Sequence, residues 1–321
     1  MARLVIVAPN WLGDAVMALP AIADLRKGSA GTTIAVVAKP AVASLFGLVP
    51  DVDEVTVKGT APVSADIGLL LPNSFRSALD LARAAVPQRW GYRSDCRGPL
   101  LTRAVDRPAA AVHQVEYYQH LVRALGFSSG PAQPHLEITP EIRSAGARAL
   151  AAAGWDGEGS LVALAPGGAY GGAKRWPPDY FAALARDLAS DGVRTVIVGT
   201  AADEPTKRAI EAAVGGGHAR PIDAVGRTDV PVLAGVLAHT RALVANDSGV
   251  AHLGAALGVP TAALFGPTDE RLTAPRSASA SVVLSHPVWC RPCMLRECPL
   301  EHACMRGISV AAVADAARRL M

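Results

Sequence analysis

The stretch Arg241-Ala-Leu-Val-Ala-Asn-Asp-Ser-Gly-Val-Ala-His-Leu-Gly-Ala-Ala-Leu-Gly-Val-Pro-Thr-Ala-Ala-Leu-Phe-Gly-Pro-Thr-Asp269 has the pattern of one βαβ unit. Apolar runs at 243–245 and 261–265 are typical of buried parallel strands. Between them, residues 246–249 offer helix-cap and turn chemistry, and the small residues of 250–257 fit a helix that packs closely on a sheet. The stretch therefore predicts a parallel α/β sheet.

The turn before this predicted helix is a candidate anion site. The first backbone N–H groups of a helix lack partners within it, and the helix dipole places positive charge there. A helix start at the carboxyl end of a parallel strand suits a phosphate or pyrophosphate. We therefore expect a nucleotide-linked ligand at Ser248, Gly249, Val250 and Ala251.

Length and composition predict two domains. The chain has 321 residues, of which 50% are hydrophobic and 18% charged, enough apolar material for two cores. Apolar strands open each half, at 4–8 and 161–165, and strands alternate with helices after both. Residues 127–139 have the Ser, Gly and Pro content of a linker. We predict two Rossmann-like domains, 1–157 and 158–321, whose parallel sheets face each other across a cleft.

Charge and hydropathy indicate a cytoplasmic protein. No apolar run reaches the ~18 residues of a membrane span, and the apolar run at 4–7 is too short for a signal peptide. The net charge of +3 is too small to indicate nucleic acid. Between 73 and 107, seven arginines outnumber three aspartates, which suggests an anionic partner or an ordinary basic face. Their spread over loop and helix argues against nucleic acid.

The loop Pro9-Asn10-Trp11-Leu12-Gly13-Asp14 follows the first strand, at the sheet edge where open α/β sheets bind ligands. Asp14 is either a general base or a helix N-cap, and spacing alone favours the cap. The loop lacks Gly-x-Gly-x-x-Gly, so it has no dinucleotide fingerprint.

A second loop, 166–177, carries four glycines and then Lys174 and Arg175. Glycines let the backbone approach a ligand closely, and the two basic residues supply positive charge without a metal. The alternative is a flexible loop with a solvated basic pair, but the preceding buried strand favours phosphate binding.

The roles of two other polar residues remain open. Glu204 either accepts hydrogen bonds from ribose hydroxyls or only favours a helix N-terminus. His252 lies one turn into the helix of the opening stretch, within reach of a phosphate or sugar hydroxyl. A lone histidine there is more often a packing residue.

The cysteines Cys290, Cys293, Cys298 and Cys304 form a dense cluster in a cysteine-poor chain. Four thiolates can hold a structural zinc ion or an iron–sulfur cluster. The spacing is not that of a standard zinc ribbon, and packed or paired thiols are the favoured alternative. No open-site partner is placed to make the cluster catalytic.

Taken together, the motifs resemble those of the bacterial lipopolysaccharide heptosyltransferases of glycosyltransferase family 9. The resemblance covers nearly the whole chain and rests on residues 9–14, 71–78, 173–177, and 246–253 with the 265–268 ending. It implies a two-domain GT-B fold in which the second domain binds ADP-heptose. The first domain would hold a lipid-A-linked core oligosaccharide, reached by peripheral contact with the inner face of the inner membrane.

The resemblance also implies an inverting transfer that needs no cofactor for catalysis. It makes Asp14 the catalytic base rather than a cap, and Lys174 a second catalytic residue. It places donor contacts at Lys174, Asp247 and the residues after it. Together with the residues argued above, the predicted donor-binding residues are Gly167, Gly168, Lys174, Arg175, Glu204, Asp247, Ser248, Gly249, Val250, Ala251 and His252. The implied acceptor-binding residues are Asn10, Trp11, Gly13, Asn73, Ser74 and Arg76.

One departure from the family concerns the loop before Lys174. Related enzymes often carry hydroxyl residues there, whereas this chain has Gly167 to Tyr170, so phosphate contacts would come from backbone N–H groups. Two rival functions stay open: another enzyme of this fold with a different nucleotide sugar, such as an epimerase or hexosyltransferase, and a non-catalytic nucleotide-sugar binder.

Overall fold

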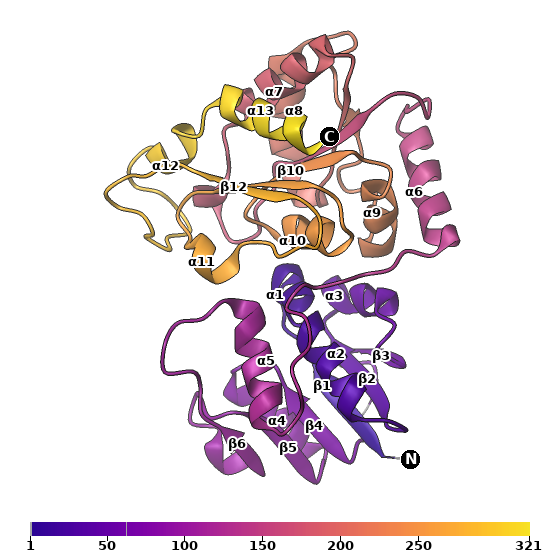
Figure 1. Ribbon diagram of the computed structural model, residues 1–321, viewed down its shortest axis with the longest axis vertical. Coiled ribbons are helices and arrows are strands. Elements are labelled where there is room, and N and C mark those ends of the chain that lie inside the picture. The colour runs from indigo at the N-terminus through magenta and orange to yellow at the C-terminus, as the bar shows by residue number, and fades with distance from the viewer. Residues whose placement is uncertain (1, 62) are drawn as a thin grey trace. The chain divides into compact units, whose positions relative to one another are not determined.

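Parallel strand pairing organises the whole chain in the computed structural model, which describes residues 2–61 and 63–321. Within these residues the strands form two six-stranded sheets, one in each of two compact units, 1–137 and 138–321. Figure 1 shows helices layered on the sheet of each unit. The α/β class with two parallel sheets, predicted from the alternation of apolar strands and helices, is confirmed.

The first sheet has the strand order β3-β2-β1-β4-β5-β6. Its strands are β1 (Arg3–Val7), β2 (Thr33–Ala38), β3 (Glu54–Val57), β4 (Ile67–Leu70), β5 (Gln88–Tyr92) and β6 (Arg103–Val105). The order reverses between β1 and β4, which are parallel neighbours with Val7 paired to Leu70. Loops that follow two such strands diverge, and open α/β sheets bind their ligands at that point.

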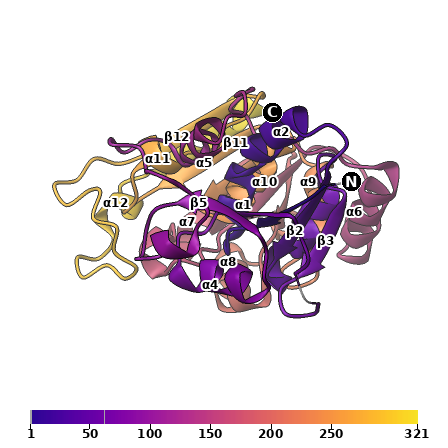
Figure 2. The ribbon, with the colours of Figure 1, turned by 90° about the horizontal axis from the view of Figure 1, so that it is seen from below.

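Helices cover both faces of the first sheet. They are α1 (Leu12–Met17), α2 (Leu19–Gly28), α3 (Pro40–Ala43), α4 (Phe75–Arg83) and α5 (Gln114–Ala124), with single turns η1 (Ser44–Leu48) and η2 (Gly98–Leu100). Figure 2 shows α2 and α5 on one side of the strands and α4 on the other. On the α4 side, Ala78 and Leu81 pack with Val7 and Leu70 in a buried cluster.

The second sheet has the order β12-β11-β10-β7-β8-β9, so its reversal lies between β10 and β7. Its strands are β7 (Leu161–Ala165), β8 (Arg194–Ile197), β9 (Ile222–Asp223), β10 (Ala242–Asn246), β11 (Thr261–Phe265) and β12 (Ser281–Ser285). β7, β10 and β11 are buried at every position, as central strands of a two-sided parallel sheet are.

The helices of the second unit also form two layers. They are α6 (Pro140–Ala152), α7 (Pro178–Ser190), α8 (Glu204–Val214), α9 (Val230–Leu237), α10 (Gly249–Ala256), α11 (Glu270–Thr273), α12 (Ala303–Arg306) and α13 (Val310–Leu320), with single turns η3 (Gly172–Lys174) and η4 (Ala201–Asp203). Figure 1 places α7, α8 and α13 on one side of the strands, and α9 and α10 on the other. The first layer packs on a buried cluster that contains Trp176 and Phe181.

Helix α6 packs on α9 through a glycine contact. A Cβ on Gly146 would lie 2.1 Å from the carbonyl carbon of Gly235, so the two helix backbones touch. This contact joins α6 to the second unit, which begins at residue 138, before the 157/158 boundary expected from the sequence.

The four strands predicted from apolar runs are present as β1, β7, β10 and β11, and the predicted helix 250–257 is present as α10. The first helical stretch is interrupted: α1 ends at Met17 and α2 begins at Leu19 with Pro20 in its first turn, where proline is tolerated. Strands β6 and β12 have weak sequence signals, because β6 has only 3 residues and β12 is buried at none of its positions. Among the described residues, none of the helices has the length and apolar character that crossing a membrane requires.

Candidate functional site

The second unit brings two loops together where its strand order reverses. Strand β7 leads into the glycine-rich loop 166–175, and the neighbouring β10 leads into the turn before α10. The fully buried Asn246 joins them. Its Nδ2 donates to the Pro166 carbonyl over 2.7 Å, and its Oδ1 accepts from the Trp176 N–H over 3.1 Å. Both ends of the loop are therefore fixed to the last residue of β10.

Lys174 and Asp247 form a largely buried ion pair at this point. The Lys174 Nζ donates to Asp247 Oδ2 over 2.6 Å, and the two side chains are 13% and 5% exposed. The same Oδ2 accepts from the Thr268 hydroxyl, also over 2.6 Å. The ammonium lies 4.8 Å from the ring centroid of Tyr170. One cation is thus held in place, where it can meet the negative charge of a phosphate.

Helix α10 begins beside this ion pair without a side-chain cap. Its N-cap residue, Ser248, makes no capping hydrogen bond, so the cap expected in this turn does not form. The Ser248 Oγ is buried and has no hydrogen-bond partner among the residues that the structure describes. The Ala251 N–H is bonded to the Ser248 carbonyl over 3.1 Å. A buried hydroxyl at the positive end of a helix is a suitable donor to an anion.

The glycine-rich loop is held close to α8. A Cβ on Gly167 would lie 2.7 Å from both carboxylate oxygens of Asp203, so only glycine fits there. Asp203 accepts from the Thr200 N–H and hydroxyl, each over 2.9 Å. Its other oxygen lies 3.8 Å from an Arg175 nitrogen. Arg175 is therefore engaged by Asp203 and does not form a solvated pair with Lys174, whereas Gly168 has its nearest neighbours at 3.7 Å.

Glu204 and His252 have different surroundings. Glu204 begins α8, with Oε1 3.1 Å from the Lys207 Nζ and 3.0 Å from the Arg208 Nε. Hydrogen bonds from Lys207 and then Arg208 hold the Glu204 pKa below its ordinary value. His252 is 5% exposed within α10. Their contributions to donor binding stay predictions.

In the first unit, Asp14 lies in the first turn of α1, after the loop that follows β1. Trp11 is the N-cap residue, so the capping role that spacing favoured for Asp14 was wrong. Asp14 is partly buried, while Asn10 and Trp11 are exposed. The pKa of Tyr118 is raised, first by burial and second by the charge of Asp14. The carboxylate and this phenol are therefore close enough to interact.

The loop after β4 adjoins the Asp14 turn because β1 and β4 pair. The Asn73 Nδ2 donates to the Tyr117 hydroxyl over 2.9 Å, while its Oδ1 is buried without a partner among the described residues. Ser74 caps α4 by accepting from the Ser77 N–H, and Arg76 pairs with Asp80 over 2.9 Å. Of the predicted acceptor residues in this loop, Asn73 thus has an unused acceptor atom.

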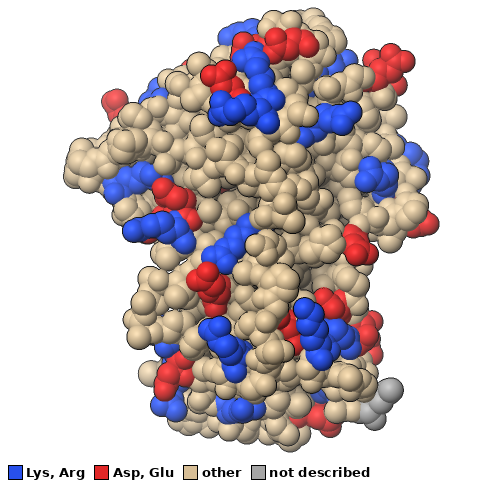
Figure 3. Space-filling model, viewed as in Figure 1, with Lys and Arg blue, Asp and Glu red and all other residues tan. Residues whose placement is uncertain are grey.

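Arg97 supports this loop from inside the unit. It is fully buried and donates to the carbonyls of Tyr92, over 2.9 Å, and Pro72. Burial lowers its pKa. Arg89 likewise donates to the Leu100 carbonyl over 2.7 Å. Part of the arginine excess is therefore internal scaffolding, and Figure 3 shows basic and acidic side chains interspersed on the visible face.

The structural metal site that was one possibility for Cys290, Cys293, Cys298 and Cys304 is not supported. Among the described residues, no group of three or more His, Cys, Asp or Glu is placed to hold an ion. All four thiols are free, and Cys304 is buried in the core of the second unit while the others are partly exposed. The Cys298 Sγ accepts two backbone N–H groups of its own turn, each over 3.3 Å. Four thiols hold an ion only where tertiary packing brings their sulfur atoms together, and sequence spacing does not determine that.

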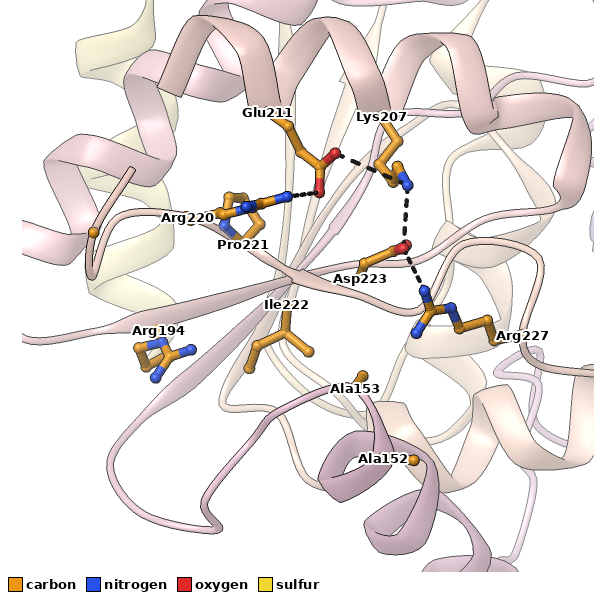
Figure 4. A pocket seen from close by; sticks show the side chains of 11 residues that line it. Ala152, Ala153, Arg194, Lys207, Glu211, Arg220, Pro221, Ile222, Asp223 and Arg227 are labelled. Carbon is orange, nitrogen blue, oxygen red and sulfur yellow. Dashed lines mark hydrogen bonds and ion pairs between the residues drawn. The ribbon is translucent and has the colours of Figure 1, made fainter. Parts of the chain in front are cut away.

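A pocket of about 440 Å³ lies elsewhere in the second unit (Figure 4). Most of its charged side chains pair with one another: Lys207 lies 3.1 Å from Asp223, Arg227 lies 2.9 Å from Asp223, and Arg220 lies 3.5 Å from Glu211. None of the predicted site residues lines it. It is therefore a separate feature from the Lys174 and Asp247 pair.

Three supporting residues were not predicted as part of the site. Asn246 and Thr268 are polar residues at or just beyond the ends of apolar strands, and that position was a usable signal. Arg97 had no such signal, because the sequence does not distinguish this buried arginine from the six other arginines between 73 and 107, which are exposed or partly exposed.

Known proteins resemble this chain over most of its length. The model of glycosyltransferase family 9 (heptosyltransferase) matches residues 59–304. Lipopolysaccharide heptosyltransferase 2 of Salmonella typhimurium strain LT2 is 30% identical over 305 residues, 88% of this chain and 87% of that protein.

Solved structures share the fold. The ADP-heptose LPS heptosyltransferase II of E. coli superposes with a TM-score of 0.85 at 26% identity, covering 99% of this chain and 98% of that one. The E. coli heptosyltransferase WaaC with ADP-2-deoxy-2-fluoro heptose has a TM-score of 0.74 at 20% identity, covering 99% and 100%. At that identity the second likeness concerns the fold alone.

Proposed function

This chain belongs to glycosyltransferase family 9, the heptosyltransferase family, and we propose that it transfers heptose from ADP-heptose to the heptosyl-Kdo2-lipid A inner core of lipopolysaccharide. The choice of acceptor is supported by relatives named heptosyltransferase 2, among them those of Salmonella typhimurium and E. coli. The observation that carries the proposal is the buried Lys174 and Asp247 pair at the strand reversal of the second unit.

The second unit is the donor half in this proposal. Lys174 and the start of α10 face the place where open α/β sheets bind phosphates. As ADP leaves, its phosphate gains negative charge, which Lys174 and the Ser248 hydroxyl would stabilise; that hydroxyl has no partner within residues 2–61 and 63–321. Lys174 is already held by Asp247, and Asn246 holds its loop, so little reorganisation of Lys174 is needed during the reaction.

Asp14 is the general base in this proposal. An acceptor hydroxyl loses its proton to the Asp14 carboxylate while its oxygen attacks the anomeric carbon. The bond from that carbon to the phosphate oxygen of ADP breaks on the opposite face, which inverts the anomeric centre. Asn10, Trp11, Gly13, Asn73, Ser74 and Arg76 are the proposed acceptor contacts around Asp14. No cofactor enters this reaction, since Lys174 provides the cation that meets the leaving group.

The test separates the two halves. Asp14→Asn should abolish transfer from ADP-heptose and leave ADP binding by calorimetry near that of the parent protein. Lys174→Met should weaken ADP binding as well as transfer. Asp106→Asn, which neutralises an exposed carboxylate in the same unit, is the matched control. Parent-like turnover by Asp14→Asn would rule out this base.

A donor panel tests the substrate itself. ADP-heptose should be turned over, and UDP-N-acetylglucosamine should not. Turnover of a different nucleotide sugar in place of ADP-heptose would favour another enzyme of this fold, and ligand binding without ADP release under any acceptor would favour a non-catalytic binder.

Because the proposed acceptor is a lipid, we also propose peripheral contact with the inner face of the inner membrane. The measurement is co-flotation with vesicles that contain the acceptor lipid. Flotation should be stronger than with acceptor-free vesicles, and no recruitment to either would refute this part.

A further inference from the structure

The residues 289–298, which contain three of the cysteines, lie between β12 and α12 and have no role in the reaction as described. We name them the bracket segment. Its large apolar side chains face outward: Trp289 is 88% exposed, Met294 50% and Leu295 45%. Apolar burial of these side chains therefore does not hold the segment in place, and its polar contacts must be considered instead.

One set of contacts reaches the glycine-rich loop just before Lys174. The Ala173 N–H donates to the Arg296 carbonyl over 2.9 Å, and the Gly172 N–H donates to the Glu297 Oε1 over 3.0 Å. The Tyr170 hydroxyl donates to the Met294 carbonyl over 2.8 Å. Tyr170, Gly172 and Ala173 are thus all hydrogen-bonded to the bracket segment.

The backbones approach so closely that only glycine fits. A Cβ on Gly171 would lie 2.3 Å from the Arg296 carbonyl oxygen. The Arg296 guanidinium lies 5.2 Å from the Tyr170 ring, and Lys174 lies 4.8 Å from the same ring. Tyr170 is therefore shared between the bracket segment and the proposed phosphate-binding lysine.

The other set of contacts reaches the loop after β11. The Arg291 Nε donates to the Gly266 carbonyl over 2.5 Å, and its Nη2 pairs with Glu270 over 2.5 Å. The Met294 N–H donates to the Pro267 carbonyl over 2.9 Å. This loop carries Thr268, whose hydroxyl holds the Asp247 carboxylate.

The bracket segment therefore joins the loop that carries Lys174 to the loop that carries Thr268, the residue that holds Asp247. We propose that it positions this ion pair for the donor diphosphate, with Glu297 and Arg291 as positioning residues. The inference rests on the proposed function, because it assigns Lys174 to the donor. A loop with four glycines has many accessible backbone conformations, and a lysine has a long flexible side chain. Contacts that fix the loop beforehand therefore reduce the conformational entropy that is lost when the donor binds.

The test uses Glu297, whose exposed side chain can be changed without opening the core. Glu297→Ala removes the acceptor for Gly172, and ADP should bind about tenfold more weakly by calorimetry. Glu297→Gln keeps an acceptor oxygen and should recover most of the affinity. Glu301→Ala, just beyond the bracket segment, is the matched control and should bind ADP like the parent protein. A parent-like affinity for Glu297→Ala would overturn the proposal.

A double-mutant cycle distinguishes positioning from general stability. In a Lys174→Met background, Glu297→Ala should cause no further loss of ADP affinity, because its effect acts through Lys174. Equal losses in both backgrounds, or no loss on Lys174→Met alone, would refute the proposal. Gly171→Ala, which displaces the Arg296 backbone, should weaken ADP binding as Glu297→Ala does. Failure of the proposed function would appear separately, as a parent protein without turnover of ADP-heptose.

Discussion

The Thr268 hydroxyl and the Lys174 ammonium donate to the same carboxylate oxygen, Oδ2 of Asp247, each over 2.6 Å. Asp247 is therefore held from two sides by residues 94 positions apart in sequence (268 − 174). Lys174, Asp247 and Thr268 thus link the end of β10 to two loops. We expect changes at these three residues to have separable effects on stability and on donor binding.

Removing one member of the ion pair should cost stability, and removing both should cost less. Lys174→Met leaves the buried Asp247 charge uncompensated, and we expect a loss of about 3 kcal/mol in the free energy of unfolding. Adding Asp247→Asn should recover part of that stability without restoring ADP affinity. Chemical denaturation and calorimetry on the single and double variants measure the two quantities. Recovery of both together would contradict a donor role for the pair.

Thr268→Val removes one hydrogen bond to Asp247 while keeping the side-chain shape. A hydrogen bond to a charged group contributes about 1.5–3 kcal/mol, so kcat/KM for ADP-heptose should fall by about tenfold or more. Thr268→Ser retains the hydroxyl and serves as the control. Steady-state kinetics with both variants tests this role. Equal kcat/KM values for Thr268→Val and Thr268→Ser would exclude it.

Chelation should leave transfer intact. Since Lys174 supplies positive charge at the proposed diphosphate site, dialysis against EDTA should not change kcat/KM. The measurement is initial rate before and after dialysis, with and without added Mg²⁺. A loss of rate that Mg²⁺ restores would show that the reaction depends on a metal in addition to Lys174.

Gly146→Ala should destabilise the second unit. The new Cβ would lie 2.1 Å from the Gly235 backbone, and this contact cannot be relieved by turning a side chain. We expect a loss of about 1–3 kcal/mol, as for other overpacked interiors, with a lower Tm in calorimetric scans. Ser144→Ala on the exposed part of α6 is the control. A Tm equal to that of the control would mean that α6 and α9 do not pack backbone to backbone.

His120 should make the first unit less stable in mild acid. Burial and the charge of Arg123 lower its pKa from 6.5, and its Nδ1 lies 2.8 Å from the Tyr92 hydroxyl. A histidine with a lowered folded pKa binds protons more readily when unfolded. Its contribution is therefore full above the unfolded pKa and is lost as pH falls through the folded one. Denaturation at pH 7.5 and pH 5.5 should show a smaller loss for His120→Gln than for the parent, and equal losses would reject this account.

Apolar patterns predicted the sheets because their signal is local. The runs 161–165 and 261–265 match β7 and β11 at both ends, since buried parallel strands are continuous apolar segments. The pairing of Lys174 with Asp247 is tertiary and depends on the strand order. Whether the four thiols of 290–304 converge on one point also depends on tertiary packing, so spacing left a metal site open that the described residues do not support.

Each sheet is made from one uninterrupted part of the chain, and residues 1–137 contain every strand of the first. Polypeptides leave the ribosome amino-terminus first, at about 5–20 residues per second. The first core can therefore close during synthesis, roughly ten seconds before β12 is translated. Its apolar strands need not wait for distant partners, which shortens the time during which they are open to aggregation.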